Sequence, residues 1–335
     1  MTKLKISVLL LSAGMLAFVA CKKDDGNSDP IVVTPTNPSN PTPGPTPTTI
    51  NALESTIANY RQAATQSFTI SSANNAAIST NSGSTFQFYS GSFQDANGNA
   101  VTGLVEVEVL EAFGFKDMVL NNMQTLTDQG QLLSSAGEFR ITARQNGQPL
   151  QLFPGATIDV RTPVQTATPN PSAMMLWNGD EGQNDLEWRT ADVENVAVQP
   201  DSAIGGNGMV YTFYLDSLDF FNLDVFMGQG VSSTSFAVNL PSGYDNTNTM
   251  VWLVFPNQNT IAALSNFDAT ANQLNTGSWY TVPIGFDVEV VVLADLNGTY
   301  FYANSSVTVA NNQTVTIPSL QSTTIAAFES FLDSL

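Results

Sequence analysis

The residues best suited to acid–base or metal chemistry lie close together in the stretch NGDEGQNDLEW, residues 178–188. Its four carboxylates belong to Asp180, Glu181, Asp185 and Glu187. Hydrolysis of a glycosidic bond needs two carboxyl groups about 5 to 9.5 Å apart, and Ca²⁺ is bound by carboxylate oxygens. Three interpretations are open: a solvated acidic loop with Trp188 half in the core, a calcium site, and a catalytic pair beside a tryptophan that stacks on a sugar. We expect the solvated loop.

Most other catalytic chemistries are excluded by composition. The chain of 335 residues has no histidine, which rules out Ser-His-Asp triads, HExxH metallopeptidase sites and His-ligated zinc. Its single cysteine is Cys21, and it has neither a G-x-x-x-x-G-K-[ST] phosphate loop nor a G-x-S-x-G nucleophile elbow. Carboxylate chemistry is what remains.

Two further patterns have ordinary structural explanations. Positions 1, 3, 5 and 12 of an EF-hand spacing are matched by Asp95, Asn97, Asn99 and Glu106. Ala100 stands where that loop needs glycine, so we expect an Asn-Gly turn instead. Four aromatic residues are either an exposed ligand platform or, as we expect, packing residues of strands: Trp177, Trp252, Trp279 and Tyr280.

The N-terminal segment has the layout of a secretory signal peptide. Lys3 and Lys5 precede an apolar run that ends at Ala20, and this run is shorter than the about 20 residues that span a bilayer. The residues Phe18-Val19-Ala20-Cys21 resemble the lipobox of bacterial lipoproteins, in which the cysteine carries the lipid and begins the mature chain. This resemblance implies a lipoprotein signal peptide at residues 1–20 and lipid attachment at Cys21.

The residues after the cysteine suggest an address and a tether. Lys22, Lys23, Asp24 and Asp25 are similar to the short tags that direct lipoproteins of the Bacteroidota to the cell surface. This resemblance implies a surface-exposed protein of the outer membrane, with the periplasm as the alternative. Residues 24–49 contain seven prolines and no aromatic residue, so they cannot bury enough apolar surface to fold. We expect residues 21–49 to be a lipidated, disordered tether.

The charge balance excludes one class of partner. The chain carries 10 basic and 29 acidic residues, a net charge of −19. Cleavage after Ala20 removes two lysines and no acid, which leaves 8 − 29 = −21. Nucleic acid is excluded as a partner, because binding to phosphates requires a basic patch. Only 12% of the residues are charged, so Asn, Gln, Ser and Thr must supply much of the polar surface.

From residue 67 onward the apolar pattern has a period of two. In LVEVEVLEA (104–112) valines alternate with glutamates, and in GEFRITARQNGQPLQLF (137–153) alternation continues on both sides of an Asn-Gly pair. Asn-Gly pairs begin at 97, 146, 178, 207 and 297, and this dipeptide favours two-residue hairpin turns. Strands with one polar face, joined by tight turns, are typical of antiparallel sheets.

The length of this region exceeds one ordinary sandwich. We therefore predict an all-β fold with two antiparallel β-sandwich domains, at residues 67–165 and 205–320. A proline-rich, irregular connector is expected between them at 166–204. Short helices are predicted at 50–66 and 321–335, the second capped by Ser322, Thr323 or Thr324.

Three motifs follow one another in the first predicted domain. They are F-x-D-x-x-G-x-x-V-T-G at Phe93–Gly103, D-M-x-L at Asp117–Leu120 and L-L-x-S-x-G-E-F at Leu132–Phe139. In this order they resemble a ZU5-like β-sandwich module of poorly characterised Bacteroidota surface proteins. The stretch LDSLDFFNLDVF (215–226) resembles a segment that accompanies such modules. The resemblance implies a sandwich fold and an interaction role, and it supplies no catalytic residue.

We expect from these observations a non-catalytic lipoprotein that binds or scaffolds at the outer membrane. Its expected partners are a glycan or an outer-membrane protein, with calcium as the one cofactor that the acidic stretch suggests. Two other classes stay open: a polysaccharide-degrading enzyme of carboxylate type, and an accessory subunit of an outer-membrane import or secretion complex.

The substitution Cys21→Ser should move the protein from the membrane fraction to the soluble fraction. The acyl chains, at about 0.8 kcal/mol per buried methylene, would provide the anchor. Metabolic labelling with a fatty acid and membrane fractionation measure this. An unchanged distribution of the variant would show that something other than lipid on Cys21 holds the protein.

Overall fold

The computed structural model describes residues 31–33, 52–165, 168–181, 186–191, 196–200 and 208–335. Within these residues strands dominate and most strand pairs are antiparallel, which confirms the predicted all-β fold. The helices are α1 (Ala52–Ala64), α2 (Phe115–Leu120) and α3 (Ile325–Leu332). α1 and α3 confirm the two predicted helices, and Thr324 caps α3 by accepting a hydrogen bond from the backbone N of Ala327. α2 was not predicted, because six residues are too few to show helical periodicity.

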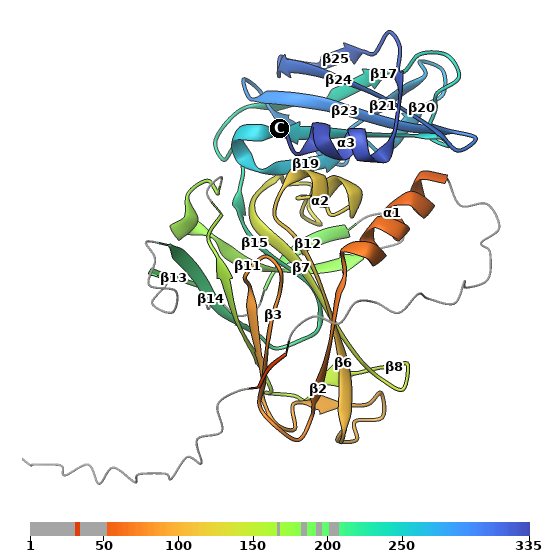
Figure 1. The fold of residues 1–335 in the computed structure, drawn as a ribbon. Helices are drawn as coiled ribbons and strands as arrows, with labels where there is room; N and C mark the ends of the chain where they lie inside the picture. The colour runs from red at the N-terminus through yellow and green to blue at the C-terminus, as the bar shows by residue number, and fades with distance from the viewer. Residues whose placement is uncertain (1–30, 34–51, 166–167, 182–185, 192–195, 201–207) are drawn as a thin grey trace, which may run out of the picture. The chain divides into compact units, whose positions relative to one another are not determined.

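Two sheets face each other in the first sandwich (Figure 1). The six-stranded sheet has the order β1 (Ile31–Val33), β3 (Ala76–Ser79), β4 (Thr85–Phe88), β10 (Ile158–Pro163), β14 (Met209–Leu215), β13 (Ala197–Pro200). The seven-stranded sheet has the order β12 (Leu186–Thr190), β11 (Met175–Glu181), β15 (Asp219–Phe226), β7 (Leu133–Gln145), β6 (Leu104–Ala112), β2 (Gln66–Ser71), with β8 (Gln148–Pro149) also paired to β7. Phe139 of β7 contacts Phe86 of β4 and Phe213 of β14 in the core between them.

Two further sheets form the second sandwich. The four-stranded sheet has the order β20 (Asn266–Asp268), β21 (Gln273–Asn275), β17 (Phe236–Asn239), β25 (Gln313–Thr316). The five-stranded sheet has the order β19 (Thr260–Ala263), β18 (Thr249–Phe255), β23 (Asp287–Leu296), β24 (Thr299–Thr308), β26 (Gln321–Thr323). Small pairs join β5 (Phe93–Gln94) to β9 (Gln151–Leu152) and β16 (Ser233–Thr234) to β22 (Val282–Pro283), and the 3-10 turns are η1 (Pro171–Ala173) and η2 (Pro256–Gln258).

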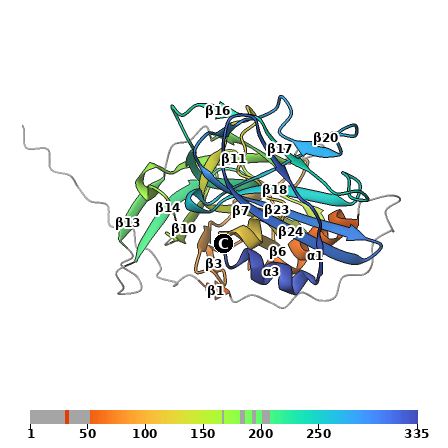
Figure 2. The same ribbon diagram turned by 90° about the horizontal axis from the view of Figure 1, so that it is seen from above.

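A third apolar core joins the seven-stranded and five-stranded sheets. It contains Trp177 and Trp188 of the first sandwich, Trp252 and Ile261 of the second, and residues of all three helices. α3 lies beside β24 in Figure 2, and the rings of Tyr302 and Phe328 are 6.2 Å apart. The seven-stranded sheet is therefore covered on both faces.

The predicted boundaries differ from the structure in two places. The connector expected at 166–204 contains β11, β12 and β13, and residues 209–226 form β14 and β15 of the first sandwich. The prolines there suggested a linker, but Pro171 begins the 3-10 turn η1 and leaves the flanking strands intact. Ile31–Val33, expected in the disordered tether, form β1 and pair in parallel with β3. This run is β-branched, which suits a strand.

The Asn-Gly pairs have different outcomes. Asn146-Gly147 and Asn297-Gly298 have positive φ at both residues and close the hairpins β7–β8 and β23–β24, as predicted. Asn178-Gly179 lies inside β11, so the turn expected there is wrong. Gly179 is required by packing, since a Cβ at this position would lie 2.5 Å from Phe220 Cβ and 2.7 Å from Trp188 Cζ3. The pair beginning at residue 207 lies outside the described residues.

The substitution Gly179→Ala should lower the free energy of unfolding by about 1–3 kcal/mol, because the added methyl group overpacks the core beside Trp188 and Phe220. Urea denaturation measures the loss. Gly114→Ala is the control, since a Cβ there meets no atom within 4 Å and φ is −126°. Equal stability of Gly179→Ala and the unchanged protein would contradict the packing argument.

Candidate functional site

The acidic stretch forms the β11–β12 hairpin at the edge of the seven-stranded sheet. Asp180 and Glu187 are opposite each other across the two strands. Asp180 accepts a hydrogen bond from Arg189 at 2.6 Å, with 61% of its side chain exposed. Glu181 forms an ion pair with Arg61 of α1. Asp185 lies outside the described residues.

The sugar-stacking role considered for Trp188 is excluded by its burial. The side chain is fully buried, deeper than the half-burial expected, and its Nε1 donates to the backbone O of Gln124 at 2.6 Å. Among the described residues no group of three His, Cys, Asp or Glu side chains is placed to hold a metal ion. The calcium site stays a prediction, because Asp185 belongs to it.

The EF-hand spacing around Asp95 is a turn, as expected. The Asp95 carboxylate accepts hydrogen bonds from the backbone N of Asn97 at 2.9 Å and of Asn99 at 2.8 Å. Glu106 lies within strand β6. Hydrogen bonds from Asn99 lower the pKa of Asp95.

The four aromatic residues do not form a platform. Trp177, Trp252 and Tyr280 are buried, as expected for packing residues, and only Trp279 is exposed, at 44%. The exposed-platform interpretation is therefore wrong for three of them.

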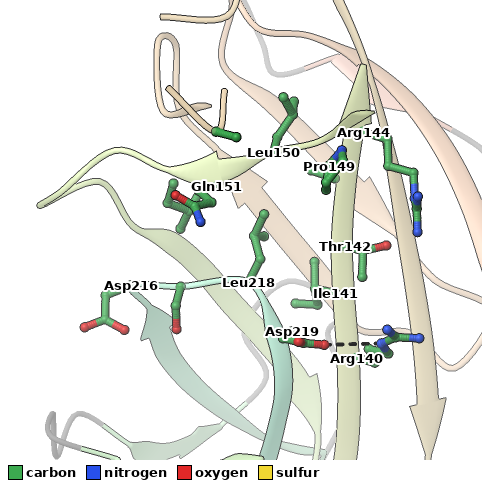
Figure 3. A pocket seen from close by; sticks show the side chains of 14 residues that line it. Arg140, Ile141, Thr142, Arg144, Pro149, Leu150, Gln151, Asp216, Leu218 and Asp219 are labelled. Carbon is green, nitrogen blue, oxygen red and sulfur yellow. Dashed lines mark hydrogen bonds and ion pairs between the residues drawn. The ribbon is translucent and has the colours of Figure 1, made fainter. Parts of the chain in front are cut away.

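A pocket of ≈ 550 Å³ lies on the first sandwich, where β7 lacks a neighbouring strand on one of its two sides (Figure 3). β15 pairs with β7 as far as Ile141, and β8 pairs with it from Arg144. Thr142 and Ala143 fall between these partners, and the gap is bordered by the segment 149–152 and the β14–β15 turn. Its volume is typical of small-ligand sites.

The pocket has an apolar floor and a polar rim. Ile141, Leu150 and Leu218 are on the floor, and Figure 3 shows Ile141 and Leu218 beside each other between β7 and the β14–β15 turn. Polar residues also line the pocket: Gln151, Asp216 and Ser217 come from its other borders, and Arg140, Thr142 and Arg144 extend from the side of β7 opposite to Ile141. Such a site can pack an apolar surface and hydrogen-bond a hydroxyl-bearing one at the same time.

The two arginines of the rim are held differently. Arg140 Nε lies 3.3 Å from Asp219 Oδ1, and its guanidinium lies 4.9 Å from the centre of the Phe220 ring. Arg144 Nε is 3.9 Å from Glu108 Oε2, and 45% of its side chain is exposed. Arg140 is therefore fixed in place, whereas Arg144 is available to a ligand.

The acids of this pocket, Asp216 and Asp219, were not among the candidate residues of the sequence analysis. They flank the turn Asp-Ser-Leu-Asp between two largely apolar strands. That spacing was the available signal, but the denser acids at 180–187 outweighed it. Only the pairing of β15 with β7 brings Asp219 to Arg140.

A second polar group is buried between the two sandwiches. Glu138 and Asn222 are opposite each other on β7 and β15, and Asp224 follows a bulge in β15. Asn222 Nδ2 donates to Asp224 Oδ2 at 2.6 Å, and Ser135 Oγ donates to Asn222 Oδ1 at 3.0 Å. Glu138 Oε2 and Asp224 Oδ1 have no hydrogen-bond partner among the described residues. These residues come from the two segments, 132–139 and 215–226, that carry the ZU5-like resemblance.

Burial governs the ionisation of this pair. Loss of solvation raises the pKa of Glu138 well above its usual value, and the negative charge of Asp224 raises it further. Burial also raises the pKa of Asp224 well above its usual value, against the opposing hydrogen bonds of Ser135 and Asn222. Among the described residues neither carboxyl group forms an ion pair. We infer a structural role for the pair in its neutral form.

The predicted lipid attachment and export residues lie outside the described residues. They are Cys21, Lys22, Lys23, Asp24 and Asp25. In the described part of the chain no helix combines the length and the apolar character needed to cross a membrane.

Comparison with known proteins gives no family. No protein-family model matches the chain, and no curated protein matches it.

The free energy of unfolding should decrease as pH rises above about 4, where these acids ionise in the unfolded chain. A raised pKa means that the folded protein holds protons that the unfolded chain releases, so the stabilisation is complete at low pH and is lost as pH rises through the raised values. Each group contributes a slope of at most about 1.4 kcal/mol per pH unit. The double variant Glu138→Gln, Asp224→Asn should reduce this slope.

Urea denaturation at several pH values from 4 to 8 measures the slope. Asp117 contributes to it in both proteins, because burial raises its pKa too. Asp216→Asn, at an exposed position, is the control and should keep the original slope. An unchanged slope in the double variant would show that the buried pair does not release protons on unfolding.

Proposed function

We propose that the chain is a non-catalytic binding protein of the cell surface that takes a sugar unit of a glycan into the pocket beside β7. The observation that carries this proposal is the apolar floor of Ile141, Leu150 and Leu218 beneath a rim of arginine, carboxylate, amide and hydroxyl groups. The proposed address, an outer-membrane lipoprotein held by lipid at Cys21, rests on the sequence alone.

A sugar ring can match both the apolar residues and the hydrogen-bonding residues of this pocket. The C–H groups of a pyranose form an apolar face, and its hydroxyl groups both donate and accept hydrogen bonds. Arginine donates through a planar fork, carboxylates accept, and glutamine does both. Gln151 and Asp216 therefore offer donors and acceptors to hydroxyl groups on one side of β7, and Arg144 offers donors from its other side.

Part of the pocket is formed before any ligand arrives. The ion pair with Asp219 and the contact with the Phe220 ring fix Arg140, so ordering this side chain adds little to the cost of binding. The strands β7 and β15 that carry these residues are paired over eight positions. A site on paired strands keeps its geometry better than one on loops.

The enzyme alternative would use Asp216 and Asp219, since two carboxyl groups are the minimum for glycoside hydrolysis. Asp219 faces Arg140, which engages its carboxylate. The pocket also opens to solvent along the β14–β15 turn, where Asp216 and Ser217 are exposed. We therefore favour binding over hydrolysis.

The double variant Arg144→Gln, Gln151→Ala should weaken binding of short oligosaccharides by about 10-fold or more. The hydrogen bond lost from charged Arg144 costs about 1.5–3 kcal/mol, and the one lost from neutral Gln151 costs about 0.5–1.5 kcal/mol. A glycan array identifies the saccharide, and isothermal titration measures its dissociation constant. Arg189→Gln is the matched control, since Arg189 pairs with Asp128 and Asp180 away from the pocket.

Hydrolysis is measured in parallel on every saccharide that binds. Turnover that disappears in Asp216→Asn or Asp219→Asn would overturn the binding proposal in favour of the enzyme. Equal affinity of the double variant and the unchanged protein would place the glycan elsewhere.

A further inference from the structure

The outer face of the four-stranded sheet carries a regular array of side chains, six of eight of which are uncharged and polar. The strand register aligns them in two rows across β20, β21, β17 and β25. One row is Asn266, Asn275, Ala237 and Thr314, and the other is Asp268, Gln273, Asn239 and Thr316. We call these eight residues the amide face. None is fully buried, whereas the alternate residues Val238, Leu274 and Val315 are in the core.

Hydrogen bonds between strands hold the amide face in one arrangement. Asn266 Nδ2 donates to Asn275 Oδ1 at 2.6 Å. In the other row Gln273 Nε2 donates to Asn239 Oδ1 at 2.8 Å, and Asn239 Nδ2 donates to Thr316 Oγ1 at 3.1 Å. These bonds extend across three neighbouring strands, so the side chains lose little freedom when a ligand binds.

The chemistry of the amide face selects its ligand. Each amide has two donor hydrogens and two acceptor lone pairs, more than the bonds between strands use. The face contains no basic residue and one acid, Asp268, whose carboxylate accepts hydrogen bonds from Thr270 N and Ala271 N. Ala237 stands between Asn275 and Thr314 as the smallest side chain of the array.

We propose that the amide face binds an extended, uncharged polysaccharide laid across the strands. Hydroxyl groups repeat along such a polymer and can each donate and accept, as the amides do. Neighbouring strands are about 4.8 Å apart, and alternate residues of one strand are about 6.5–7 Å apart. The face therefore offers hydrogen-bonding groups at short, regular intervals in two directions.

The other classes of partner fit the face less well. A nucleic acid needs cations, of which the face has none. A protein interface uses buried aromatic or arginine anchors, and Ala237 is the one apolar residue of the array. The amide face lies on the second sandwich, so this inference does not depend on the pocket beside β7.

Binding of a soluble, linear, uncharged glucan to the full-length chain in detergent tests the proposal, with a polyuronate of similar length as the charged comparison. The double variant Asn239→Ala, Gln273→Ala should raise the dissociation constant for the glucan at least ten-fold. Asn239→Asp keeps the shape of the side chain but loses the donor to Thr316, and it should weaken binding in the same direction. Thermal melting confirms that each variant is folded.

Two exposed amides of the first sandwich give the matched control. The double variant Asn81→Ala, Gln148→Ala removes the same number of amide groups and should leave glucan binding within two-fold. Glucan affinity unchanged by the amide-face substitutions would overturn the proposal, as would tighter, variant-sensitive binding of the polyuronate. If the chain self-associates and the amide-face substitutions abolish this, the face is a contact between copies, and the proposal is overturned.

The pocket substitutions Arg144→Gln, Gln151→Ala keep the two proposals distinguishable. They should weaken the binding of short oligosaccharides and leave the dissociation constant for the glucan unchanged within two-fold. The amide-face substitutions should show the opposite pattern.

Discussion

Burial of the seven-stranded sheet on both faces is the constraint on which the rest of the structure depends. One face packs on the six-stranded sheet through residues such as Phe139 and Phe221. The other packs on the helices and the second sandwich through residues such as Leu133 and Phe220. A strand between two cores must be apolar on both sides or must satisfy its polar groups internally. In β7 and β15 some positions are apolar on both sides, and at others the polar groups are satisfied internally.

Glu138, Asn222 and Asp224 are buried polar residues of these two strands that must be satisfied within the protein. Isolated charges at full burial would cost several kcal/mol each, so protons and amide hydrogens must replace water. Asn222 bridges the two carboxyl groups, donating to one at 2.6 Å and to the other at 3.4 Å. A polar group of this kind specifies one alignment of β15 on β7, because shifting the strand by one residue would place its members in the opposite core.

The same pair of strands produces the pocket. β15 leaves β7 at Asp219, so on this side of β7 no strand pairs with Thr142 and Ala143 before β8 begins, while β6 continues on the other side. The buried part of the β7–β15 pair thus specifies the alignment of the two strands. The end where β15 leaves β7 forms a cavity lined by arginines and carboxylates. The amide face has a different origin, since the outer side of an antiparallel sheet is free to be polar throughout. The two proposed binding surfaces therefore belong to different sandwiches.

The sequence by itself determined the β class, the helices α1 and α3, and which residues of many strands face the core. Period-two alternation was sufficient because neighbouring residues of a strand point to opposite sides, as for Val105 and Glu106. Local turn chemistry also predicted the hairpins at Asn146 and Asn297. Such features are set by residues adjacent in the chain, and they do not require knowledge of the partner strands.

Only the tertiary structure decided the extent of the first sandwich, the positions of the tryptophans and the location of the pocket. Gly179 has the sequence of a turn but lies in a strand, because Trp188 and Phe220 need the space that a side chain would fill. Asp219 and Arg140 are 79 positions apart in the sequence, and they are brought together by a strand pairing that no local pattern encodes. The acids at 180–187 were the densest in the sequence, whereas Asp219 of the pocket gains its arginine neighbour only through folding. Chemistry at a site depends on distances in space, and the sequence specifies these only through long-range pairing.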